Sequence, residues 1–477
     1  MAFKDNREFV AALEKAGEAI QIEQEVDWDL EAGAIVRRVC ETGAPAPFFQ
    51  KIKDYPGHRM LGAMCSSFKR LAIALGLRAD IPIREAADEF YRRRQKRIKP
   101  VIVKDAPCQQ NMVTGKDVDL TMFPAPMVHD GDGGRYLCTW HLVITKEPNS
   151  DWVNWGMYRQ MLHNERLLGT LALPNSDLGK MLAKYEAKEE KIPFATAIGA
   201  DPLCAAAGCL SVGVGVSEVE VAGGLRQEPV ELVKCKTVDL EVPAHAEIIL
   251  EGHVLPGVRV DEGPFGEYTG FRTSPRYPRP VFQVECITWR DNPILTMSNM
   301  GVPIADGNII VSGLGTPALI RGLLESSGIP ITGVYVPPEG CGFIVIVATK
   351  KPYNNIAAHI ASVISAQPFL QASVSQIIVV DDTVDPYNMS EVIHAMATKL
   401  HPLKGTFTFP CMGWPLAPYL SMAERMQFRG GKIVYDCTWP LEWDPETEKP
   451  VKSSFRGIYP EEVQKKVLDN WQKYGFK

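Results

Sequence analysis

Apolar and polar positions follow three successive patterns along this chain, and each pattern predicts a different arrangement of elements. Up to about residue 100, helical spacing alternates with short apolar runs, which predicts a small α/β domain. Asp5 and Glu8 form a capping-box pair and predict where the first helix begins. Phe9 and Leu13 supply the apolar face of that helix, and Gly17 is expected to end it.

Between about residues 110 and 305 the pattern changes to apolar runs separated by turn residues, and the spacing predicts an antiparallel, barrel-like domain. The expected strands cover residues 141–145, 152–162, 194–198, 230–235, 246–250 and 281–288. From about residue 310 the α/β pattern returns. Its expected strands are residues 333–336, 343–348 and 377–380, and its expected helices are residues 356–364 and 390–400.

The three patterns together predict a mixed α/β (α+β) protein of several domains. The expected domains are residues 1–110, 111–308 and 309–450, followed by a C-terminal segment at residues 451–477. In that last segment, apolar spacing makes residues 460–474 an amphipathic helix that Gly475 should end. The apolar face of this helix is expected to pack on a neighbour.

Composition and charge narrow the class of protein. The chain has 477 residues, too many for one core, and its hydrophobic content of 45% is that of a globular protein. The formal net charge of -6 argues against nucleic acid as the main partner. No stretch approaches the ~20 apolar residues of a membrane span, and the start MAFKDNREFV lacks the apolar core of a signal peptide. The 11 cysteines are scattered without a Cys-x-x-Cys, which favours reduced thiols in the cytoplasm.

Two carboxylates in the segment Glu262-Gly-Pro-Phe-Gly-Glu267 are the first candidates for chemistry. Glycines and a proline restrict the backbone between them, so a shaped loop holds both carboxylates. Two such groups aimed into a pocket can divide labour, one staying ionised and the other carrying a proton. The segment alone does not identify a reaction.

Arg159 is the next candidate, in the segment Asn154-Trp-Gly-Met-Tyr-Arg159. On a continuous strand it would share a face with Trp155 and Met157, where its burial is costly unless an anion pairs with it. Two interpretations stay open. Arg159 is either an exposed strand-end residue in a structural salt bridge, or a fork that binds a carboxylate and pairs with an active-site glutamate.

Oxygen-bearing side chains at further positions are candidates for a hard divalent cation. Ser176 and Asp177 stand at a helix entry, where capping is their ordinary role. Glu218 lies on a polar turn, where a glutamate is ordinarily exposed. Together with Asn154, these residues supply the oxygen ligands that such a cation takes, and the cation could bind a cofactor phosphate.

Two glycine-containing segments imitate binding motifs without completing them. Gly313-Leu-Gly315 lacks the third glycine of a dinucleotide fingerprint and is expected to lie in a strand or turn. The segment Asp130-Gly-Asp132-Gly-Gly134 begins like a calcium-binding EF-hand loop, but position twelve is His141 rather than glutamate. As a flexible polar loop, that segment could still cover a site.

Three motifs taken together resemble the UbiD family of reversible decarboxylases. They are Asn154-x-Gly-x-Tyr-Arg159, Ser217-Glu218-x5-Gly224 and Glu262-Gly-Pro-Phe-Gly-Glu267-x-Thr-Gly, and their order and spacing make the resemblance specific. It extends over nearly the whole chain, and the tail is similar to that of the ferulic acid decarboxylase branch. The resemblance implies prenylated flavin mononucleotide (prenylated FMN) as cofactor. It also implies a flavin-binding split β-barrel at residues 111–308 and an oligomerisation domain at residues 309–450.

The resemblance further implies roles for individual residues. Arg159, Glu262 and Glu267 match the catalytic network of the family. Arg159 would position the substrate carboxylate, Glu262 would hold Arg159 and tune Glu267, and Glu267 would deliver a proton after carbon dioxide leaves. Asn154 and Glu218 match ligands of a manganese ion that, with potassium, bridges the protein and the flavin phosphate. The implied cofactor-binding residues are Asn154, Met157, Tyr158, Arg159, Ser176, Asp177, Glu218 and Lys432.

Two positions depart from the family pattern. The histidine that usually serves as third metal ligand is missing, and Asp177 is the expected substitute, ahead of Ser176. The predicted metal ligands are therefore Asn154, Asp177 and Glu218. Gln376 stands where related enzymes often carry a basic residue, which leaves one phosphate or flavin contact open. Lys432 matches a recurrent glycine-lysine element and is a candidate anion contact.

These residues predict a UbiD-type carboxy-lyase that acts on an aromatic, heteroaromatic or α,β-unsaturated carboxylic acid. Leu171, Leu173 and Phe265 are expected to keep the pocket apolar, with Tyr268 and Asn308 as further lining. A cofactor-independent, metal-assisted hydrolase and a non-catalytic subunit of a decarboxylase complex stay open as alternatives. The expected partners are the acid and carbon dioxide, a flavin prenyltransferase that supplies the cofactor, and further copies of the chain in a homodimer or homohexamer, without nucleic acid or membrane.

Overall fold

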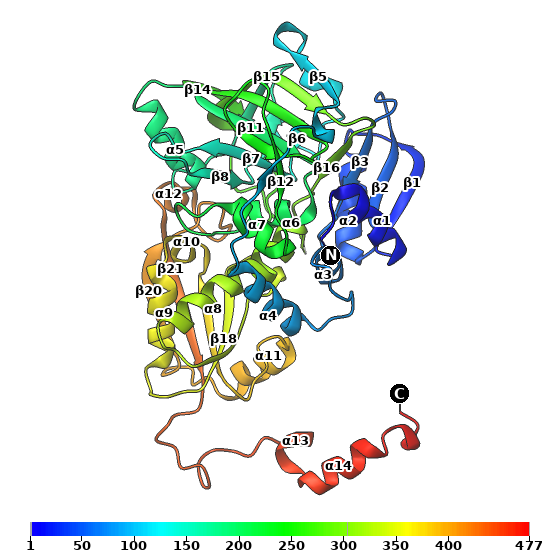
Figure 1. The fold of residues 1–477 in the computed structure, drawn as a ribbon. Helices are drawn as coiled ribbons and strands as arrows, with labels where there is room; N and C mark the ends of the chain where they lie inside the picture. Colours follow the sequence, from blue (N-terminus) through cyan, green and yellow to red (C-terminus); the bar gives the residue numbers. More distant parts are fainter. Residues whose placement is uncertain (1, 303, 477) are drawn as a thin grey trace.

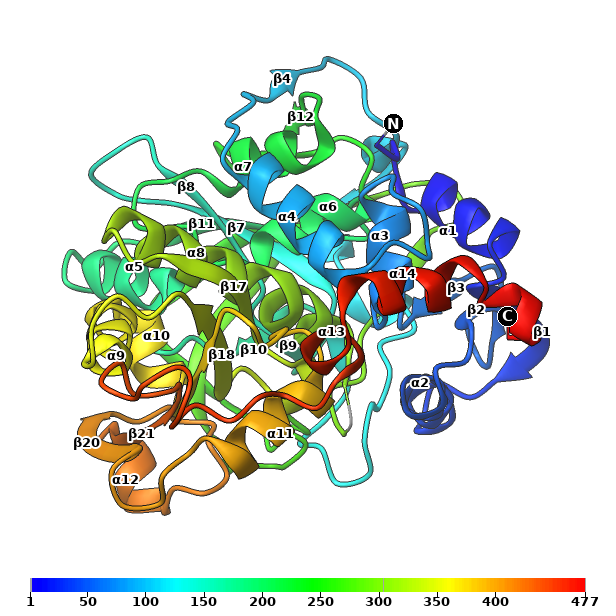
Figure 2. The same ribbon diagram turned by 90° about the horizontal axis from the view of Figure 1, so that it is seen from below.

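The computed structural model describes residues 2–302 and 304–476, which form four β-sheets with helices around them (Figure 1). The mixed α/β architecture predicted from the sequence is confirmed. Along the chain the elements group into N-terminal, central and C-terminal parts, and a tail extends beyond the third part (Figures 1 and 2).

The N-terminal part packs helices against a four-stranded sheet of order β1-β2-β3-β16. The β1–β2 and β3–β16 pairs are parallel, and the β2–β3 pair is antiparallel. The elements are α1 (Asn6–Lys15), β1 (Ala19–Val26), α2 (Glu31–Thr42), β2 (Ala46–Ile52), β3 (Arg59–Gly62), α3 (Phe68–Ala74), α4 (Ile83–Arg94) and β16 (Ile294–Met297). Because β16 comes from the sequence region predicted as the central domain, the two parts share a sheet, and the domain boundaries remain predictions.

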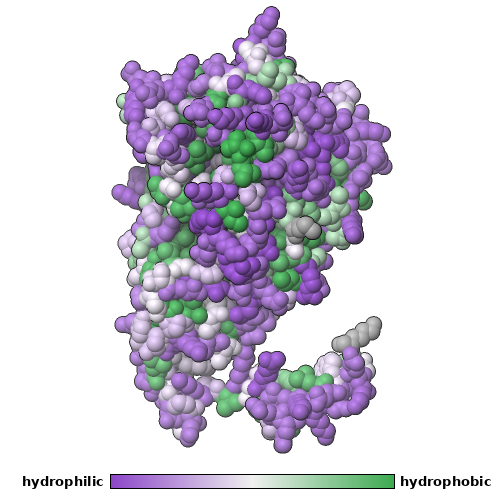
Figure 3. All heavy atoms as spheres, viewed as in Figure 1, coloured by the Kyte–Doolittle hydropathy of each residue, from purple (hydrophilic) through white to green (hydrophobic). Residues whose placement is uncertain are grey.

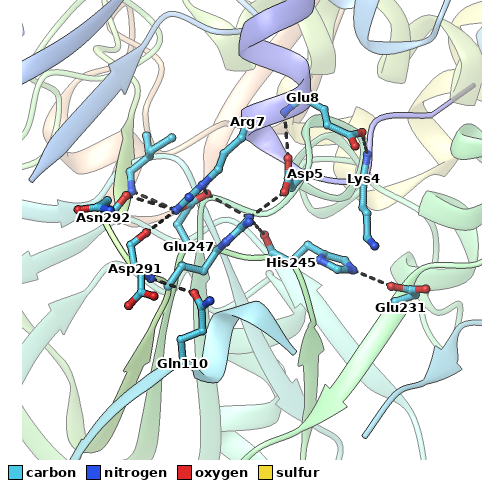
Figure 4. A network of polar contacts seen from close by, with 12 residues as sticks. Lys4, Asp5, Arg7, Glu8, Gln110, Glu231, His245, Glu247, Asp291 and Asn292 are labelled. Atoms are coloured by element: carbon cyan, nitrogen blue, oxygen red, sulfur yellow. Dashed lines mark hydrogen bonds and ion pairs between the residues drawn. The ribbon is translucent and has the colours of Figure 1, made fainter. Parts of the chain in front are cut away.

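Helix α1 begins at the predicted cap, where the Asp5 carboxylate accepts a 2.9 Å hydrogen bond from the N–H of Glu8. The same end of the helix is tied to the central part by a buried ionic network (Figure 4). Arg7 donates from Nε and Nη2 to the two oxygens of Glu247 at 2.9 and 2.7 Å, and Arg290 donates to Asp5 at 2.8 Å. The Glu247 side chain has 0% exposed surface, so the guanidinium groups offset a buried negative charge.

The central part is a nine-stranded antiparallel sheet that does not close. Its path runs β6-β9-β10-β15-β14-β11-β7-β8, and β5 pairs with β15 at the side. The strands are β5 (Asn111–Thr114), β6 (Tyr136–Cys138), β7 (His141–Lys146), β8 (Val153–Gly156), β9 (Gln160–Leu162), β10 (Leu167–Thr170), β11 (Ile192–Ile198), β14 (Ile248–Glu262) and β15 (Tyr277–Trp289). No pairing joins β6 to β8 within residues 2–302 and 304–476, so the split barrel is open between these two strands.

Both faces of the central sheet are buried, which explains why β7 and β11 are mostly apolar. On β7, Val143 packs into one core, while Leu142 and Ile144 pack into the other. Successive residues of a strand point to opposite faces, so one apolar run serves two cores. The covering elements are α5 (Asp177–Glu186) on the first core, and α6 (Pro202–Gly208), α7 (Glu218–Arg226), β12 (Glu231–Lys234) and β13 (Glu241–Pro243) on the second. The exposed strand β4 (Val101–Ile102) pairs with β12.

The strand predicted at residues 152–162 is in fact two strands, which overturns the side-chain alternation expected along it. β8 ends at Gly156 and β9 begins at Gln160. β8 is the last strand of the sheet path, whereas β9 is next to the first. The connection formed by Met157, Tyr158 and Arg159 therefore crosses the opening of the split barrel. The directions of these three side chains are set by that crossing and not by strand alternation.

The C-terminal part is a five-stranded sheet of order β17-β18-β19-β21-β20 with apolar cores on both faces. The three inner strands are parallel, and each edge strand is antiparallel to its neighbour. The elements are β17 (Ile331–Tyr335), β18 (Ile344–Thr349), α9 (Ile356–Ala366), α10 (Pro368–Ser373), β19 (Gln376–Asp381), α11 (Met389–Thr398), β20 (Thr406–Met412), α12 (Met422–Met426) and β21 (Arg429–Cys437). The strands and helices predicted here are found within a few residues of their expected bounds.

One helical stretch, Asn308–Ser326, leads from the central to the C-terminal part. It begins as a π-helix, η4 (Asn308–Gly315), and continues as α8 (Thr316–Ser326). The prediction that Gly313 and Gly315 lie in a strand or turn is therefore wrong. A Cβ on Gly313 would stand 2.8 Å from the Phe68 ring, so close packing explains the glycine.

The same stretch corrects a second expectation. By length and composition alone, Asn308–Ser326 is apolar enough to cross a membrane, although no stretch was expected to approach that limit. Within the protein, 61% of its apolar window is buried, as in a core helix. The remaining short helices are η1 (Pro107–Gln109), η2 (Gly115–Asp117), η3 (Leu120–Met122) and η5 (Pro338–Gly340).

The tail extends away from the body and carries α13 (Phe455–Ile458) and α14 (Glu461–Asp469) (Figures 1 and 2). The predicted amphipathic helix is confirmed with one interruption, because η6 (Gln472–Tyr474) follows α14 after two residues and precedes Gly475. Leu468 and Trp471 expose 59% and 42% of their surface. In the single chain, the apolar side chains of the tail are therefore largely uncovered.

Candidate active site

Arg159 lies between two buried carboxylates, on the connection that crosses the opening of the split barrel. Its Nε donates to Glu262 Oε1 at 2.8 Å, and its Nη2 donates to Glu262 Oε2 at 3.1 Å, which is a bidentate pair. Its Nη1 donates to Glu267 Oε1. The side chains of Arg159, Glu262 and Glu267 expose 8%, 1% and 8% of their surface. The structure therefore brings together the three residues predicted to be catalytic.

The backbone between the two glutamates forms the shaped loop that the sequence indicates. Glu262 is the last residue of β14, and Gly263 follows with a φ of +81°, which favours glycine. Phe265 is 2% exposed, and its ring centroid lies 5.1 Å from Arg159 Cζ. An aromatic face beside a guanidinium and little exposed surface strengthen the ion pairs of the site.

Tyr136 is a member of the site that sequence analysis missed. From β6, its hydroxyl donates a 2.6 Å hydrogen bond to Glu262 Oε1. Burial, together with the negative charge of Glu262, raises the pKa of the Tyr136 phenol, so this group stays a donor. Among the described side-chain contacts, Glu262 thus accepts three hydrogen bonds and Glu267 accepts one, from Arg159. The only local signal was the position of Tyr136 just after the unusual loop at residues 130–134.

A second polar cluster gathers around the hydroxyl of Tyr158. Asn154 lies on β8, Asp177 begins α5 and Glu218 begins α7, and all three side chains lie near enough to influence the Tyr158 hydroxyl. The Tyr158 hydroxyl accepts a 3.3 Å hydrogen bond from a backbone N–H in the first turn of α5. Glu218 accepts a 3.0 Å hydrogen bond from a backbone N–H of β8. Burial raises the pKa of Tyr158 to about 12, and the charges of Asp177 and Glu218 act in the same direction.

This cluster has the properties of a site for a hard cation. Glu218 is 2% exposed; burial raises its pKa to about 8, and the Asp177 carboxylate adds to the rise. The Asn154 side chain is also buried, and its Nδ2 has no hydrogen-bond partner in the described structure. Carboxylate and amide oxygens are the ligands that Mn2+ or Mg2+ takes. Over residues 2–302 and 304–476 no three His, Cys, Asp or Glu side chains form a metal site by themselves, so the set depends on the Asn154 amide.

Ser176 and Asp177, the two candidates for the third metal ligand, have different local roles. The Ser176 hydroxyl caps α5, accepting from the N–H of Gly179 at 3.1 Å and donating to the carbonyl of Leu173 at 2.7 Å. The Asp177 carboxylate pairs with Lys180 at 3.0 Å and is 31% exposed. Because capping already occupies Ser176, Asp177 is the better placed of the two to bind a cation.

Two predicted cofactor-binding residues make their contacts elsewhere. Met157 packs on the N-terminal core, with its Sδ 3.7 Å from Cys209 Sγ. Lys432 on β21 donates from Nζ to the carbonyls of Leu370, at 2.9 Å, and Val374, at the end of α10. Burial lowers the pKa of Lys432 to about 8. The described hydrogen bonds of Lys432 thus stabilise the end of α10, and none of them joins Lys432 to Arg159.

The expected pocket lining is mostly buried. Leu171 and Phe265 expose 9% and 2% of their surface, and Leu173 is half-buried. Asn308 donates a 3.3 Å hydrogen bond from Nδ2 to the carbonyl of Tyr268. Since Tyr268 directly follows Glu267, this bond links the start of the π-helix to the carboxylate loop.

Comparisons with known sequences identify the family to which the chain belongs. Three families match the chain: the 3-octaprenyl-4-hydroxybenzoate carboxy-lyase N-terminal domain over residues 10–90, the Rift-related domain of that enzyme over residues 99–303 and its C-terminal domain over residues 310–437. The chain is 32% identical to pyrrole-2-carboxylic acid decarboxylase from Pseudomonas aeruginosa, covering 99% of this chain and 98% of that protein. It is 30% identical to ferulic acid decarboxylase 1 from Saccharomyces cerevisiae, with 99% and 98% covered.

The fold is also similar to solved structures. Vanillic acid decarboxylase from Sedimentibacter hydroxybenzoicus in closed form matches with a TM-score of 0.90 at 30% identity, covering 98% of this chain and 99% of that chain. The open form of that enzyme gives a TM-score of 0.85. An evolved dimeric form of the UbiD-class enzyme HmfF from Pelotomaculum thermopropionicum, in complex with prFMN, matches with a TM-score of 0.81 at 26% identity, covering 97% and 100%.

Proposed function

The chain belongs to the UbiD family of carboxy-lyases, on the ferulic acid decarboxylase side, and from this premise we propose its reaction. It removes carbon dioxide, reversibly and without oxidation, from an aromatic, heteroaromatic or α,β-unsaturated carboxylic acid with the help of prenylated FMN. The observation that carries the proposal is the buried Arg159 guanidinium, forked between Glu262 and Glu267. The relatives named for pyrrole-2-carboxylic, ferulic and vanillic acids support this class of substrate.

In this proposal Arg159 binds the substrate carboxylate. A guanidinium carries five N–H donors, and the contacts with Glu262 and Glu267 use one donor on each of its three nitrogens. Two donors therefore remain for the substrate. The bidentate bond to Glu262 fixes the plane of the guanidinium, so the bound acid is held in one orientation.

Glu267 supplies the proton. One guanidinium offsets only one of two negative charges in a site with little exposed surface, so a proton on one carboxyl group relieves the like-charge repulsion. Glu262, held by three hydrogen bonds, is the ionised member, and Glu267 carries the proton. When the bond to the carboxylate breaks, its electron pair stays on the substrate carbon, carbon dioxide leaves, and the Glu267 proton moves to that carbon. Glu267 must then be protonated again before the next turnover.

The second cluster would hold the phosphate of the cofactor, with cations supplying positive charge. Prenylated FMN, when bound, supplies the electron sink that an sp2 carbon lacks. Asn154, Asp177 and Glu218 would ligate Mn2+, with K+ beside it, because their oxygen donors and buried charge suit cations. The first turns of α5 and α7 lie at the same cluster, and helix N-termini favour phosphate. The HmfF neighbour that contains prFMN supports this cofactor.

Further copies of this chain and a flavin prenyltransferase are the proposed partners. The prenyltransferase would supply the cofactor. The HmfF neighbour is a dimeric form. The tail of this chain exposes apolar side chains on α13 and α14, and Figure 3 shows a small apolar group on its otherwise mostly hydrophilic face. Covering that surface with a second subunit gives a homodimer, or a homohexamer built from dimers, in which the C-terminal part and the tail form the interface.

The proposal is tested by producing the chain together with a flavin prenyltransferase and following two signals. The purified protein should show flavin absorbance bands, and it should release carbon dioxide from at least one acid in a panel of pyrrole-2-carboxylate, vanillate, ferulate and cinnamate. Protein made without the prenyltransferase should be inactive on the same panel. Full cofactor occupancy without carbon dioxide from any aryl or acrylic acid, or equal activity without flavin, would contradict the proposal.

A further inference from the structure

The loop at residues 129–136 packs directly against the loop that carries Glu262 and Glu267, and no role assigned so far accounts for it. The N–H of Gly133 donates to the carbonyl of Pro264 at 2.7 Å. The N–H of Gly266 donates to Asp132 Oδ1 at 3.0 Å. The second bond fixes the residue immediately before Glu267.

Asp132 is built into this contact and is not a solvated surface residue. Its side chain has 0% exposed surface. Besides Oδ1, which faces Gly266, its Oδ2 lies 2.8 Å from His129 Nδ1 and accepts from the N–H of His129 at 3.1 Å. Arg272 lies 3.8 Å from Oδ1 and is 41% exposed. A buried carboxylate with both oxygens engaged holds its neighbours in one arrangement.

His129 meets hydrogen-bond acceptors on both sides of its ring. Nδ1 faces the Asp132 carboxylate, and Nε2 lies 2.9 Å from both Asn299 Oδ1 and the carbonyl of Met300. Asn299 donates from its own Nδ2 to the carbonyl of Gly33, which supports the orientation of that amide. Only the imidazolium form, with a donor on each nitrogen, satisfies all of these partners. His129 and Asp132 therefore form an ion pair that is anchored to the segment after β16 and, through Asn299, to α2 of the N-terminal part.

The His129 ring also touches the carboxylate loop directly. Its centroid is 5.5 Å from that of Phe265, in an edge-to-face arrangement with an interplanar angle of 73°. A Cβ on Gly266 would stand 2.7 Å from the ring, so the imidazole packs against the Gly266 backbone. At the other end of the same loop, Tyr136 donates to Glu262.

We propose that His129 and Asp132 are positioning residues for the reaction, which hold the Gly266 backbone and thereby set where the Glu267 carboxyl points. Neither residue touches the substrate in this account. Through Asn299 and Met300, the pair ties the residue that carries the proton to the N-terminal part. The inference rests on the proposed role of Glu267, and the test below separates the two.

The first readout does not need catalysis. Hydrogen–deuterium exchange over residues 262–270 in the full-length chain reports whether the N–H of Gly266 is held. Asp132→Ala should speed exchange in this segment by about 10-fold or more, because the acceptor is removed. Asp132→Asn keeps one acceptor oxygen for Gly266 but places an NH2 group where Oδ2 faces His129. Its exchange should therefore be slower than that of Asp132→Ala and faster than that of wild type. Asp130→Ala, which changes an exposed residue of the same loop, should stay near wild type.

The second readout is steady-state decarboxylation of the best acid from the panel, at equal cofactor occupancy. Asp132→Ala should lower kcat by roughly 10- to 100-fold with KM changed by less than about threefold, because displaced catalytic groups lose rate while Arg159 still binds the substrate. Asp132→Asn should recover part of the lost kcat, because it keeps the acceptor for Gly266 and loses the ion pair with His129. A general loss of folding would not be rescued in this selective way.

Normal exchange over residues 262–270 in Asp132→Ala, or a wild-type kcat in that variant, overturns the positioning role. If Asp132→Ala fails to fold, His129→Gln is tested instead. A wild-type kcat in His129→Gln would also contradict the positioning role. An inactive Glu267→Gln beside a fully active Asp132→Ala rejects this inference and leaves the proposed function standing. A fully active Glu267→Gln rejects the proposed function, while the exchange data still decide whether Asp132 holds the loop.

Discussion

Glu262 and Glu267 share one guanidinium but are held differently, and that difference assigns their roles. Glu262 is fixed by two nitrogens of Arg159 and by the Tyr136 hydroxyl. Glu267 receives a single side-chain hydrogen bond, from Arg159, among the described contacts. A carboxylate with three donors is stabilised as an anion, and one with a single donor is freer to exchange a proton. The unequal hydrogen bonding is the physical basis for distinguishing anchor from proton donor.

The third metal ligand is tested by a matched pair of neighbouring substitutions. Asp177→Ala should lower the bound Mn2+ of the purified protein several-fold, because it removes a carboxylate next to the buried Glu218. Ser176→Ala removes a helix cap, worth about 1 kcal/mol of stability, and should leave the metal content unchanged. Elemental analysis of both variants decides. Equal metal content in Asp177→Ala and wild type would leave Asp177 as a first-turn residue of α5 and nothing more.

His141 makes stability depend on pH. It is buried on β7 and its Nε2 lies 2.9 Å from the carbonyl of Tyr158, and burial lowers its pKa from 6.5 to about 4. The unfolded chain therefore takes up a proton near pH 6.5 that the folded chain refuses until near pH 4. This contribution to stability is present above pH 6.5 and is lost as the pH falls, by about 2 kcal/mol between pH 7 and pH 5.

Urea unfolding at pH 7 and pH 5 checks this expectation. His141→Gln lacks this titrating group. Between pH 7 and pH 5, its free energy of unfolding should therefore fall by about 2 kcal/mol less than that of wild type. An identical fall in both proteins would show that His141 is not the buried neutral group described here.

The sequence predicted the residues of the site that lie in short motifs, but it did not predict Tyr136, which lies outside them. Arg159, Glu262 and Glu267 were recognisable because each stands in a motif of restricted backbone and because the family resemblance joined them. Tyr136 lies 126 residues from Glu262 and is brought to it only by the pairing of distant strands. Lys432 is predicted to contact the cofactor; its described hydrogen bonds are to backbone carbonyls at the end of α10, and the cofactor contact stays a prediction. Contacts that form only when distant segments pack together leave no local pattern in the sequence.

At the scale of elements, the crossing between β8 and β9 is the feature on which the site depends. Both segments have strand-like sequences, and nothing in their residues shows that they pair at opposite ends of an open sheet. Long-range pairing decides this, and a local period of two cannot report it. The same limit applies to β16, which lies in the central stretch of sequence and pairs with β3 in the N-terminal sheet. Strands and helices themselves followed the apolar pattern closely.

The ionic network at α1 should contribute strongly to the stability of the N-terminal part (Figure 4). Glu247→Ala leaves Arg7 and Arg290 without their buried partner and should cost about 3 to 5 kcal/mol. Glu41→Ala is the matched control, because its pair with Arg38 is exposed on both sides, at 40% and 74%, and such pairs contribute ~0.5 kcal/mol. Denaturant midpoints measure both. Equal small losses would mean that the network is not a structural anchor.

At the scale of the whole molecule, the tail is the part that a single chain does not explain. Within residues 2–302 and 304–476, none of the apolar cores includes a residue after Cys437. The body therefore does not need the tail for its packing, whereas the tail carries apolar side chains with no described core to join. The sequence predicted both the amphipathic helix and its need for a neighbour, and the second part is still a prediction.

Removing residues 451–477 should therefore reduce the oligomer and leave the body folded. Light scattering after size exclusion should show a smaller assembly, with the thermal transition of the body retained. The double variant Leu468→Ala, Trp471→Ala should act in the same direction, and Lys465→Ala, on an exposed charged position of α14, should not. An unchanged assembly after truncation would mean that the tail is not an interface.

The rate of carbon dioxide release by Glu267→Gln, compared with wild type at equal prenylated FMN content, tests the central claim most directly. Flavin absorbance sets the occupancy, and Asp261→Asn, at an exposed neighbouring carboxylate, is the control. Proton donors of this kind typically contribute 10²- to 10⁴-fold in rate, so turnover should fall by at least about 100-fold in Glu267→Gln while cofactor content and Asp261→Asn stay near wild type. Wild-type turnover by Glu267→Gln at full occupancy would contradict the account.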